Sequence, residues 1–305
     1  MTGIGSPLIL VTGASGFLGR ATLAALAGRH VMVRAVSRQP REATEGVSWF
    51  QADLARSEGW AEALAGVDTI VHLAGNPGKG SDRDLMIANA ETSGRLASVA
   101  AGHGVRRFVY VSSIRVYGHA GRIDETTPVD ASDGYGRSKF AGEEAVTAAA
   151  GHAMGVSILR PAFVYGADRG GLLRIMMSAA RYGVPMPLSG LANRRSMIAS
   201  DNLGDLLATA AVDRRTDNYA LPVAEDGAWT YERMLEQFAL LLGRRPRTFS
   251  LPPALFRNAL RPLASAETLR RLLEDCVVDA SAVQRRLEWA PPFAATEIFR
   301  RMLHL

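Results

Sequence analysis

Tyr135 and Lys139 stand four positions apart, a spacing at which two residues of a helix share one face. A phenol is a poor acid or base at neutral pH, but a nearby ammonium favours the phenolate and makes proton transfer feasible. Ser113, which follows an apolar run, can form a hydrogen bond with the same substrate oxygen. These three residues are therefore the candidate catalytic group, with Tyr135 as the acid or base.

Lysine is rare in this chain, which gives weight to its position. Of the 35 basic residues only Lys79 and Lys139 are lysine, so the remaining 33 are arginine. An ammonium is more compact than a guanidinium, and its pKa changes readily on burial. A solvent-facing pair of Tyr135 and Lys139 is the alternative interpretation, and the choice of lysine at position 139 argues against it.

A glycine-rich segment, Thr-Gly-Ala-Ser-Gly-Phe-Leu-Gly at 12–19, directly follows an apolar run at 8–12. Glycine permits a tight turn, lets backbone amides approach a pyrophosphate and allows close packing of a helix on a strand. The helix expected at 17–26 then directs its positive end at the phosphates. A purely structural turn is the alternative, but a strand before and a helix after favour a dinucleotide site. The expected contacts are Gly13, Ser15, Gly16, Phe17, Leu18 and Gly19.

The adenosine end of the cofactor is expected near Ser37 and Arg38. NAD-binding sheets usually present an acidic residue about 20 residues beyond the glycine motif. Here no carboxylate occurs until Glu42. A hydroxyl and a guanidinium bind a 2′-phosphate, which a carboxylate would repel. NADP(H) is therefore favoured and NAD(H) is possible, while an exposed loop arginine is the alternative interpretation of Arg38.

Short apolar runs alternate with helix-like segments through the first half of the chain. This pattern predicts an α/β fold, a doubly wound parallel sheet of the Rossmann type. The expected strands are 8–12, 31–36, 47–50, 69–73, 108–112 and 156–160, and the expected helices are 17–26, 60–64 and 85–101. Beyond Gly166 the alternation stops and prolines cluster. We expect a Rossmann domain over 1–166, extended by elements from 197–221, and a smaller mixed α/β substrate-binding part over 167–305.

Further cofactor contacts are expected where the third and fourth strands end. A carboxylate there can accept a hydrogen bond from the adenine amino group, and the backbone after the fourth strand can line the cofactor. The residues at these places are Asp53, Leu54, Leu73, Ala74 and Gly75. His72 is interpreted as a structural histidine at a strand end. Asn89 is expected to hold together backbone groups near the site.

Composition excludes several classes of protein. The net charge is +5, but the basic residues occur as scattered pairs without interleaved aromatic residues, so no nucleic acid is expected as a partner. No apolar run approaches the ~20 residues that cross a bilayer, so no membrane contact is expected either. A single cysteine, Cys276, excludes a disulfide framework or a multi-thiolate metal site within the chain. The N-terminal residues lack a leader pattern, and a cytoplasmic location is expected.

These motifs together resemble the extended short-chain dehydrogenases/reductases, also called the NAD-dependent epimerase/dehydratase family, over nearly the whole chain. The resemblance continues in the segments 160–166, 195–198, 201–203 and 287–291. It implies that Tyr135 and Lys139 also contact the cofactor, and that Pro161 and Val164 lie at the nicotinamide. It further implies that Arg195 contacts the diphosphate of a nucleotide sugar, with an exposed charge as the alternative. A homodimer is usual for this family.

Members of the family catalyse several reactions, and one difference between this chain and the family reduces the number of reactions expected here. Its 4,6-dehydratases carry an Asp-Glu pair just after the catalytic hydroxyl residue, where this chain has Ile114 and Arg115, so dehydration is not expected. Ser37 and Arg38 favour dissociable NADPH and hence net reduction. The motifs resemble the branch that reduces UDP-4-keto-6-deoxy-N-acetylglucosamine for surface-polysaccharide synthesis, which predicts a 4-ketoreductase.

Two alternatives to the ketoreductase stay open. The first is an NAD-dependent 4-epimerase of a UDP-hexose or UDP-N-acetylhexosamine. The second belongs to another class, an NADP-sensing regulator or an RNA-binding protein of the same superfamily. Members of that class usually lose the catalytic tyrosine or lysine, whereas this chain keeps Tyr135, Lys139 and Ser113.

Overall fold

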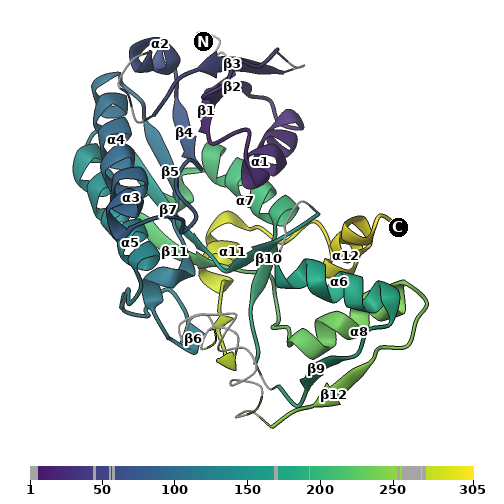
Figure 1. The fold of residues 1–305 in the computed structure, drawn as a ribbon. Helices are drawn as coiled ribbons and strands as arrows, with labels where there is room; N and C mark the ends of the chain where they lie inside the picture. The colour runs from purple at the N-terminus through teal and green to yellow at the C-terminus, as the bar shows by residue number, and fades with distance from the viewer. Residues whose placement is uncertain are drawn as a thin grey trace.

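Seven parallel strands form the central sheet of the computed structural model, which describes residues 6–43, 46–54, 56, 59–167, 171–191, 193–252, 255, 269 and 273–305. The strand order is β11-β7-β5-β4-β1-β2-β3 (Figure 1), and every pairing between these strands is parallel. The expected doubly wound α/β fold is confirmed. The strands are β1 (Leu8–Thr12), β2 (Met32–Ser37), β3 (Val47–Gln51), β4 (Thr69–His72), β5 (Arg107–Val111), β7 (Gly155–Pro161) and β11 (Tyr219–Val223).

Helices cover both faces of this sheet, as Figure 1 shows. One face carries α1 (Phe17–Ala27), α7 (Ser200–Val212) and α11 (Ser281–Leu287). The other carries α2 (Trp60–Leu64), α4 (Thr92–Gly102) and α5 (Gly134–Ala150). Side chains of one strand alternate between the two cores, so Ile9 and Val11 pack beneath α7 and Leu10 packs on the opposite face. No helix in the described ranges combines the length and apolarity that crossing a membrane requires.

The helix expected at 85–101 consists of three pieces. It begins earlier, as α3 (Asp82–Met86), because Ser81 and Asp84 form a reciprocal capping box. A π-helical turn, η1 (Ile87–Glu91), then inserts before α4. Turns of this kind often mark functional sites, and this one contains Asn89.

A smaller part with its own core lies at the lower right of Figure 1. Met176, Phe238 and Phe299 are buried in it, one from each of its three helices. The helices are α6 (Leu172–Tyr182), α8 (Tyr231–Leu241) and α12 (Ala295–Leu303). Three two-stranded sheets join β10 (Met197–Ala199) to β8 (Phe163–Tyr165), β12 (Thr248–Ser250) to β9 (Met186–Ser189), and β13 (Val277–Val278) to β6 (Arg122–Ile123). Two short helical turns, η2 (Ile114–Tyr117) and η3 (Arg214–Thr216), complete the described elements.

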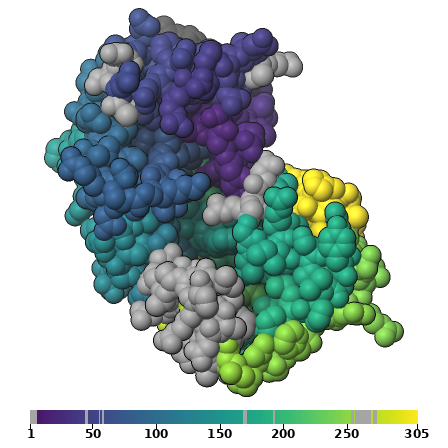
Figure 2. All heavy atoms as spheres, viewed as in Figure 1, coloured from purple at the N-terminus to yellow at the C-terminus, as the bar shows by residue number. Residues whose placement is uncertain are grey.

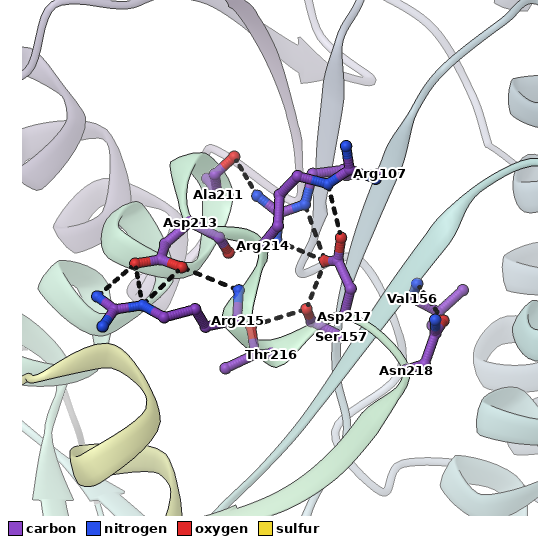
Figure 3. A network of polar contacts seen from close by, with 10 residues as sticks. All are labelled: Arg107, Val156, Ser157, Ala211, Asp213, Arg214, Arg215, Thr216, Asp217 and Asn218. Carbon is purple, nitrogen blue, oxygen red and sulfur yellow. Dashed lines mark hydrogen bonds and ion pairs between the residues drawn. The ribbon is translucent and has the colours of Figure 1, made fainter.

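β11 lies at one edge of the sheet and is the last of its seven strands in chain order. A buried polar network fixes it to the sheet (Figure 3). Arg107, the first residue of β5, donates to Asp217 Oδ1 from Nε at 2.9 Å and from Nη2 at 2.7 Å. The same guanidinium also reaches the carbonyls of Ala211 at 3.0 Å and Asp213 at 2.6 Å. These bonds satisfy the buried guanidinium of Arg107, which lies at the amino ends of the strands. The cofactor motifs lie at the opposite edge, where the strands end.

Close packing of α1 against α7 depends on Gly204. A Cβ at this position would lie 2.7 Å from the carbonyl carbon of Ala21 and 2.8 Å from its oxygen. Because those atoms belong to the backbone of α1, the two helices would have to separate. The late helix α7 is thereby coupled to the helix that follows the glycine motif.

Gly204→Ala is expected to lower the free energy of unfolding by about 1–3 kcal/mol through this overpacking. Gly102→Ala is the matched control, because Gly102 ends α4 with no atom within 4 Å of its added Cβ. The control is expected to change stability by no more than about 0.5 kcal/mol. Urea unfolding followed by circular dichroism measures both variants. Equal losses in the two would contradict the packing role of Gly204.

Candidate active site

The site lies at the carboxyl ends of the strands, where β1 has β2 on one side and β4 on the other. Chain connections diverge at this point, and doubly wound sheets bind ligands in the resulting crevice. Two hollows of about 420 and 460 Å³ open here, and Leu73 and Gly75 line both. Figure 2 shows the surface hollowed between the purple-to-blue sheet part and the green C-terminal part. The two hollows therefore adjoin each other at Leu73 and Gly75.

The first hollow contains a cradle suited to a pyrophosphate. Gly13 adopts φ of +67°, and a Cβ there would lie 2.7 Å from the backbone nitrogen of Ala74. The amide of Gly16 closes the turn on the carbonyl of Gly13 at 2.9 Å. The first turn of α1 has neither an acidic residue nor a side-chain hydrogen bond at its N-cap Gly16, and the positive end of a helix favours an anion. These features fit the phosphates of a dinucleotide.

Most of the residues predicted for cofactor and substrate surround these hollows. The first hollow is lined by Gly13, Ser15, Gly16, Ser37, Arg38, Asp53, Leu54, Leu73, Ala74 and Gly75. The second is lined by Phe17, Leu18, Leu73, Gly75, Ser113, Tyr135, Lys139, Pro161, Val164 and Arg195. Gly19 lines neither hollow. Its absent side chain leaves room for the carbonyls of Gly13 and Ala14, so it sets how closely α1 packs on the loop.

The three candidate catalytic residues meet at the second hollow. Tyr135 and Lys139 lie on successive turns of α5, whose N-cap Asp133 accepts a hydrogen bond from the amide of Gly136 at 2.8 Å. Ser113 is the N-cap of η2, directly after β5, and all three side chains line the same cavity. The geometry therefore brings together a phenol, an ammonium and a hydroxyl, the set that proton transfer at one substrate oxygen requires.

Lys139 carries its charge into a buried place. Its side chain is 6% exposed, and Nζ lies 4.7 Å from the centroid of the Tyr110 ring. Burial lowers the pKa of Lys139 from 10.5 to about 8, and the nearby Glu143 carboxylate opposes this shift. An ammonium that is charged near neutrality but close to its titration point can support a phenolate and can also release a proton.

A buried ion pair beneath Lys139 was absent from the sequence prediction. Arg160, the residue before Pro161, donates to Glu143 from Nε at 3.0 Å and from Nη2 at 2.5 Å. Ser112 also donates to Glu143, and Arg160 donates to the hydroxyl of Tyr117 at 2.9 Å. The signal in the sequence was a carboxylate four residues after Lys139, on the same face of the helix.

The π-helical turn presents Asn89 to the loop after β4. Its Oδ1 accepts from the amide of Asn76 at 2.7 Å, and its Nδ2 donates to the carbonyl of Asn76 at 3.0 Å. Nδ2 also donates to Ser138 Oγ at 2.9 Å, beside Lys139. Asn89 thus holds the loop after β4 to α5. The sequence likewise predicts that Asn89 holds together backbone groups near the site.

His72 is a buried structural residue. Nδ1 forms a hydrogen bond with Thr12 Oγ1 at 2.7 Å and Nε2 forms one with Ser93 Oγ at 3.0 Å. Burial, followed by the charge of Lys139, lowers the pKa of His72 to about 3. A neutral imidazole with both nitrogens engaged joins β1, β4 and α4.

Arg115 and Tyr231 are among the residues that line the second hollow and that sequence reasoning did not assign to it. Tyr231 begins α8 and belongs to the C-terminal part; burial raises its pKa, while the charge of Arg195 lowers it. The site is therefore built from both parts of the chain. No cluster of histidine, cysteine and acidic residues suited to a metal ion occurs in the portion that the structure describes.

Comparison with known proteins places this site in a family. The model of the NAD dependent epimerase/dehydratase family matches residues 9–219, more than half of the chain. The chain belongs to this family and is an NAD(P)-dependent enzyme of the extended short-chain dehydrogenase/reductase type. The family resemblance stated from the motifs is thereby confirmed.

Individual relatives share both length and fold. The UDP-glucose 4-epimerase of Vibrio cholerae is 26% identical over 309 residues, which cover 96% of this chain and 93% of the relative. The structure of MoeE5 in complex with UDP-glucuronic acid and NAD has a TM-score of 0.78 and 25% identity, with 97% of each chain covered. The UDP-N-acetylglucosamine 4-epimerase of Bacillus cereus has a TM-score of 0.81 and 16% identity over 98% of this chain and 99% of the other, a likeness of fold.

Lys139 is expected to titrate near pH 8, and Glu143→Gln is expected to move this titration to lower pH. The sign follows because the Glu143 carboxylate raises the pKa of Lys139 and the amide does not. Lys139 and Lys79 are the two lysines of the chain, so protein labelled with ¹³Cε-lysine gives two signals, and the exposed Lys79 serves as the internal reference.

Glu144→Gln is the matched control, since Glu144 is the next residue and faces solvent. It is expected to leave the Lys139 titration unchanged. Glu143→Gln also disturbs the buried pair with Arg160 and is expected to lower stability by up to about 3–5 kcal/mol, so each variant is titrated well below its melting temperature. The same midpoint in both variants would contradict the role of Glu143.

Proposed function

We propose that this protein is a UDP-sugar 4-epimerase, acting on a UDP-hexose or a UDP-N-acetylhexosamine. The observation that carries the proposal is the position of Tyr135, Lys139 and Ser113 in a hollow that adjoins the dinucleotide cradle and shares Leu73 and Gly75 with it. Two of the relatives above are named as 4-epimerases and both match nearly the full chain, the one from Vibrio cholerae at 26% identity. These likenesses support the epimerase better than the ketoreductase that the sequence motifs favoured.

The residues of the chain divide the proposed chemistry among them. Tyr135 removes the proton of the sugar 4-hydroxyl and later returns it to the 4-keto oxygen, while Ser113 forms a hydrogen bond with that oxygen. Lys139 favours the phenolate by its charge. The nicotinamide cofactor, when bound along the cradle at Gly13, supplies the hydride chemistry at C4 in either candidate reaction. Arg195 lines the same hollow and is the candidate contact for the diphosphate.

A 4-ketoreductase that uses NADPH is the second candidate, and one observation favours it. The first hollow reaches Ser37 and Arg38 at the end of β2, a position where a carboxylate usually holds the ribose of NAD. Asp53 is the acidic residue among the lining of that hollow. A hydroxyl and a guanidinium at the end of β2 suit a 2′-phosphate, and a dissociable NADPH suits net reduction.

The epimerase is expected to convert UDP-glucose or UDP-N-acetylglucosamine into its C4 epimer with no net change in the absorbance of the reduced cofactor. Purified protein is incubated with each sugar and either coenzyme, and the products are separated by anion-exchange chromatography. Stoichiometric loss of NADPH with a 4-keto-6-deoxy UDP-sugar, without epimer formation from either parent sugar, would contradict this expectation and favour the ketoreductase.

Tyr135→Phe is expected to lower kcat by about 10²–10⁴-fold because it removes the proton-transfer group. Tyr182→Phe is the control, since Tyr182 is 76% exposed at the end of α6 and lies outside both hollows. Steady-state kinetics on the substrate found above provides the comparison. Turnover by Tyr135→Phe at the rate of the control would remove the basis of the proposed mechanism.

Arg38→Asp is expected to shift the preference from NADP(H) toward NAD(H) by about 10-fold or more, because a carboxylate repels a 2′-phosphate and accepts from ribose hydroxyls. Fluorescence titration of the bound coenzyme yields the ratio of the two dissociation constants. Arg300→Asp is the control, because Arg300 is an exposed residue of α12 outside both hollows. An unchanged ratio in Arg38→Asp would mean that Arg38 does not read the 2′ position.

A further inference from the structure

Arg115 lies over the ring of the candidate catalytic tyrosine. Its Cζ is 4.7 Å from the centroid of the Tyr135 ring, within the range of a cation–π interaction. Nothing in the proposed mechanism uses this guanidinium, although it lines the same hollow as Ser113. Arg115 also occupies one of the two positions where the family's dehydratases carry acidic residues, so its charge distinguishes this chain.

Asp133 fixes the guanidinium in place. Arg115 donates from Nε to Asp133 Oδ2 at 3.0 Å, and its Nη2 lies 2.5 Å from Oδ1. The same carboxylate caps the catalytic helix by accepting from the amide of Gly136. The Asp133 carboxylate therefore links the start of α5 to the Arg115 guanidinium. That guanidinium lies over the ring of Tyr135, which follows Asp133 by two positions.

Two glycines lie against this arrangement, and one of them, Gly136, leaves the room that it needs. Gly78 has φ of +105°, and a Cβ there would lie 3.7 Å from Arg115 Nη1 and 3.8 Å from Tyr135 Cδ2. At Gly136 an added Cβ would collide with the carbonyl oxygen of Arg115. The loop after β4, the turn η2 and the helix α5 thus meet at the stacked pair, and the backbone holds Arg115 against Tyr135.

We propose that Arg115 is a positioning residue for Tyr135, which holds the ring at the second hollow and stabilises its ionised form. The inference rests on the proposed function for the reaction that it serves. A cation above an aromatic face attracts the π-electrons, and the attraction grows when the ring carries the negative charge of a phenolate. Arg115 and Lys139 then act on Tyr135 from two different elements, η2 and α5.

The charged groups described near Tyr135 are paired with one another. Asp133 is bound by Arg115 and caps the start of α5. Tyr110, from β5, stays neutral because burial raises its pKa far above the ordinary value. On α5 itself, Arg137 forms an ion pair with Asp82 at 2.6 Å. The proposal therefore assigns two cations to the phenolate, Arg115 from η2 and Lys139 from α5.

The test compares Arg115→Met and Arg115→Lys with Arg137→Met. The control removes a cation from the same helix end, one whose guanidinium binds Asp82 and the carbonyl of Ser132 instead of Asp133. Protein labelled with ¹³Cζ-tyrosine carries seven tyrosine signals, and Tyr135→Phe identifies the one that belongs to Tyr135. Its ionisation is followed by pH titration, without any substrate.

Arg115→Met is expected to raise the ionisation midpoint of Tyr135 by about 0.5–1 pH unit, a shift of the size that a cation–π contact supplies. Arg115→Lys is expected to restore at least half of this shift, and Arg137→Met to show none. In turnover, the acid limb of the pH profile is expected to move with the midpoint, and kcat at neutral pH to fall about 3–10-fold with KM within twofold.

Each contrary result has a distinct meaning. A midpoint in Arg115→Met that matches the Arg137→Met control overturns the proposal, as does a raised KM with unchanged kcat, which would make Arg115 a substrate contact alone. The tyrosine titration requires no turnover, so a shifted midpoint in a protein that forms no C4 epimer supports the role of Arg115 and counts only against the proposed function. Thermal melting verifies that each variant is folded, and Arg115→Lys provides the test if Arg115→Met is not.

Discussion

The buried ammonium of Lys139 is the constraint around which the site is organised. A charge removed from water requires partners, and the chain supplies them from several elements. The Tyr110 ring of β5 lies beside the nitrogen, and Glu143 on the next turn of α5 raises the pKa that burial lowers. Glu143 is in turn bound by Arg160 of β7, so the ends of two neighbouring strands and one helix are held in a fixed relation.

That arrangement explains why the residues proposed for the cofactor and for proton transfer line adjoining hollows. Arg160 directly precedes Pro161, which lines the second hollow, so the pair that balances the lysine also positions the backbone expected at the nicotinamide. Asn89 performs a similar task on the other side, joining the loop after β4 to Ser138 on α5. The catalytic helix is therefore fixed from the sheet below it and from the loop beside it.

Much of this could be read from the sequence, because the informative features are local. The run 8–12 is the strand β1 to the residue, and the glycine spacing predicted the cradle after it. The spacing of Tyr135 and Lys139 likewise needed only a helix. The contacts of Arg115 and Arg160 could not be predicted in this way, since they join residues 17 to 20 positions apart through tertiary packing. The π-helical turn at Ile87–Glu91 has no signature in hydrophobic spacing, because it depends on Asn89 reaching the loop.

The position of β11 and α7 has a consequence for how the chain reaches this state during synthesis. The glycine motif is translated well before α7, yet α1 packs against α7, which is encoded about 180 residues later, and the edge of β7 stays open until residues 219–223 arrive. Contacts between segments so distant in sequence slow folding and leave apolar surface uncovered in the interim. The nascent chain must therefore hold α1 without its partner helix until α7 is made, a period in which chaperones would find an exposed flank of α1.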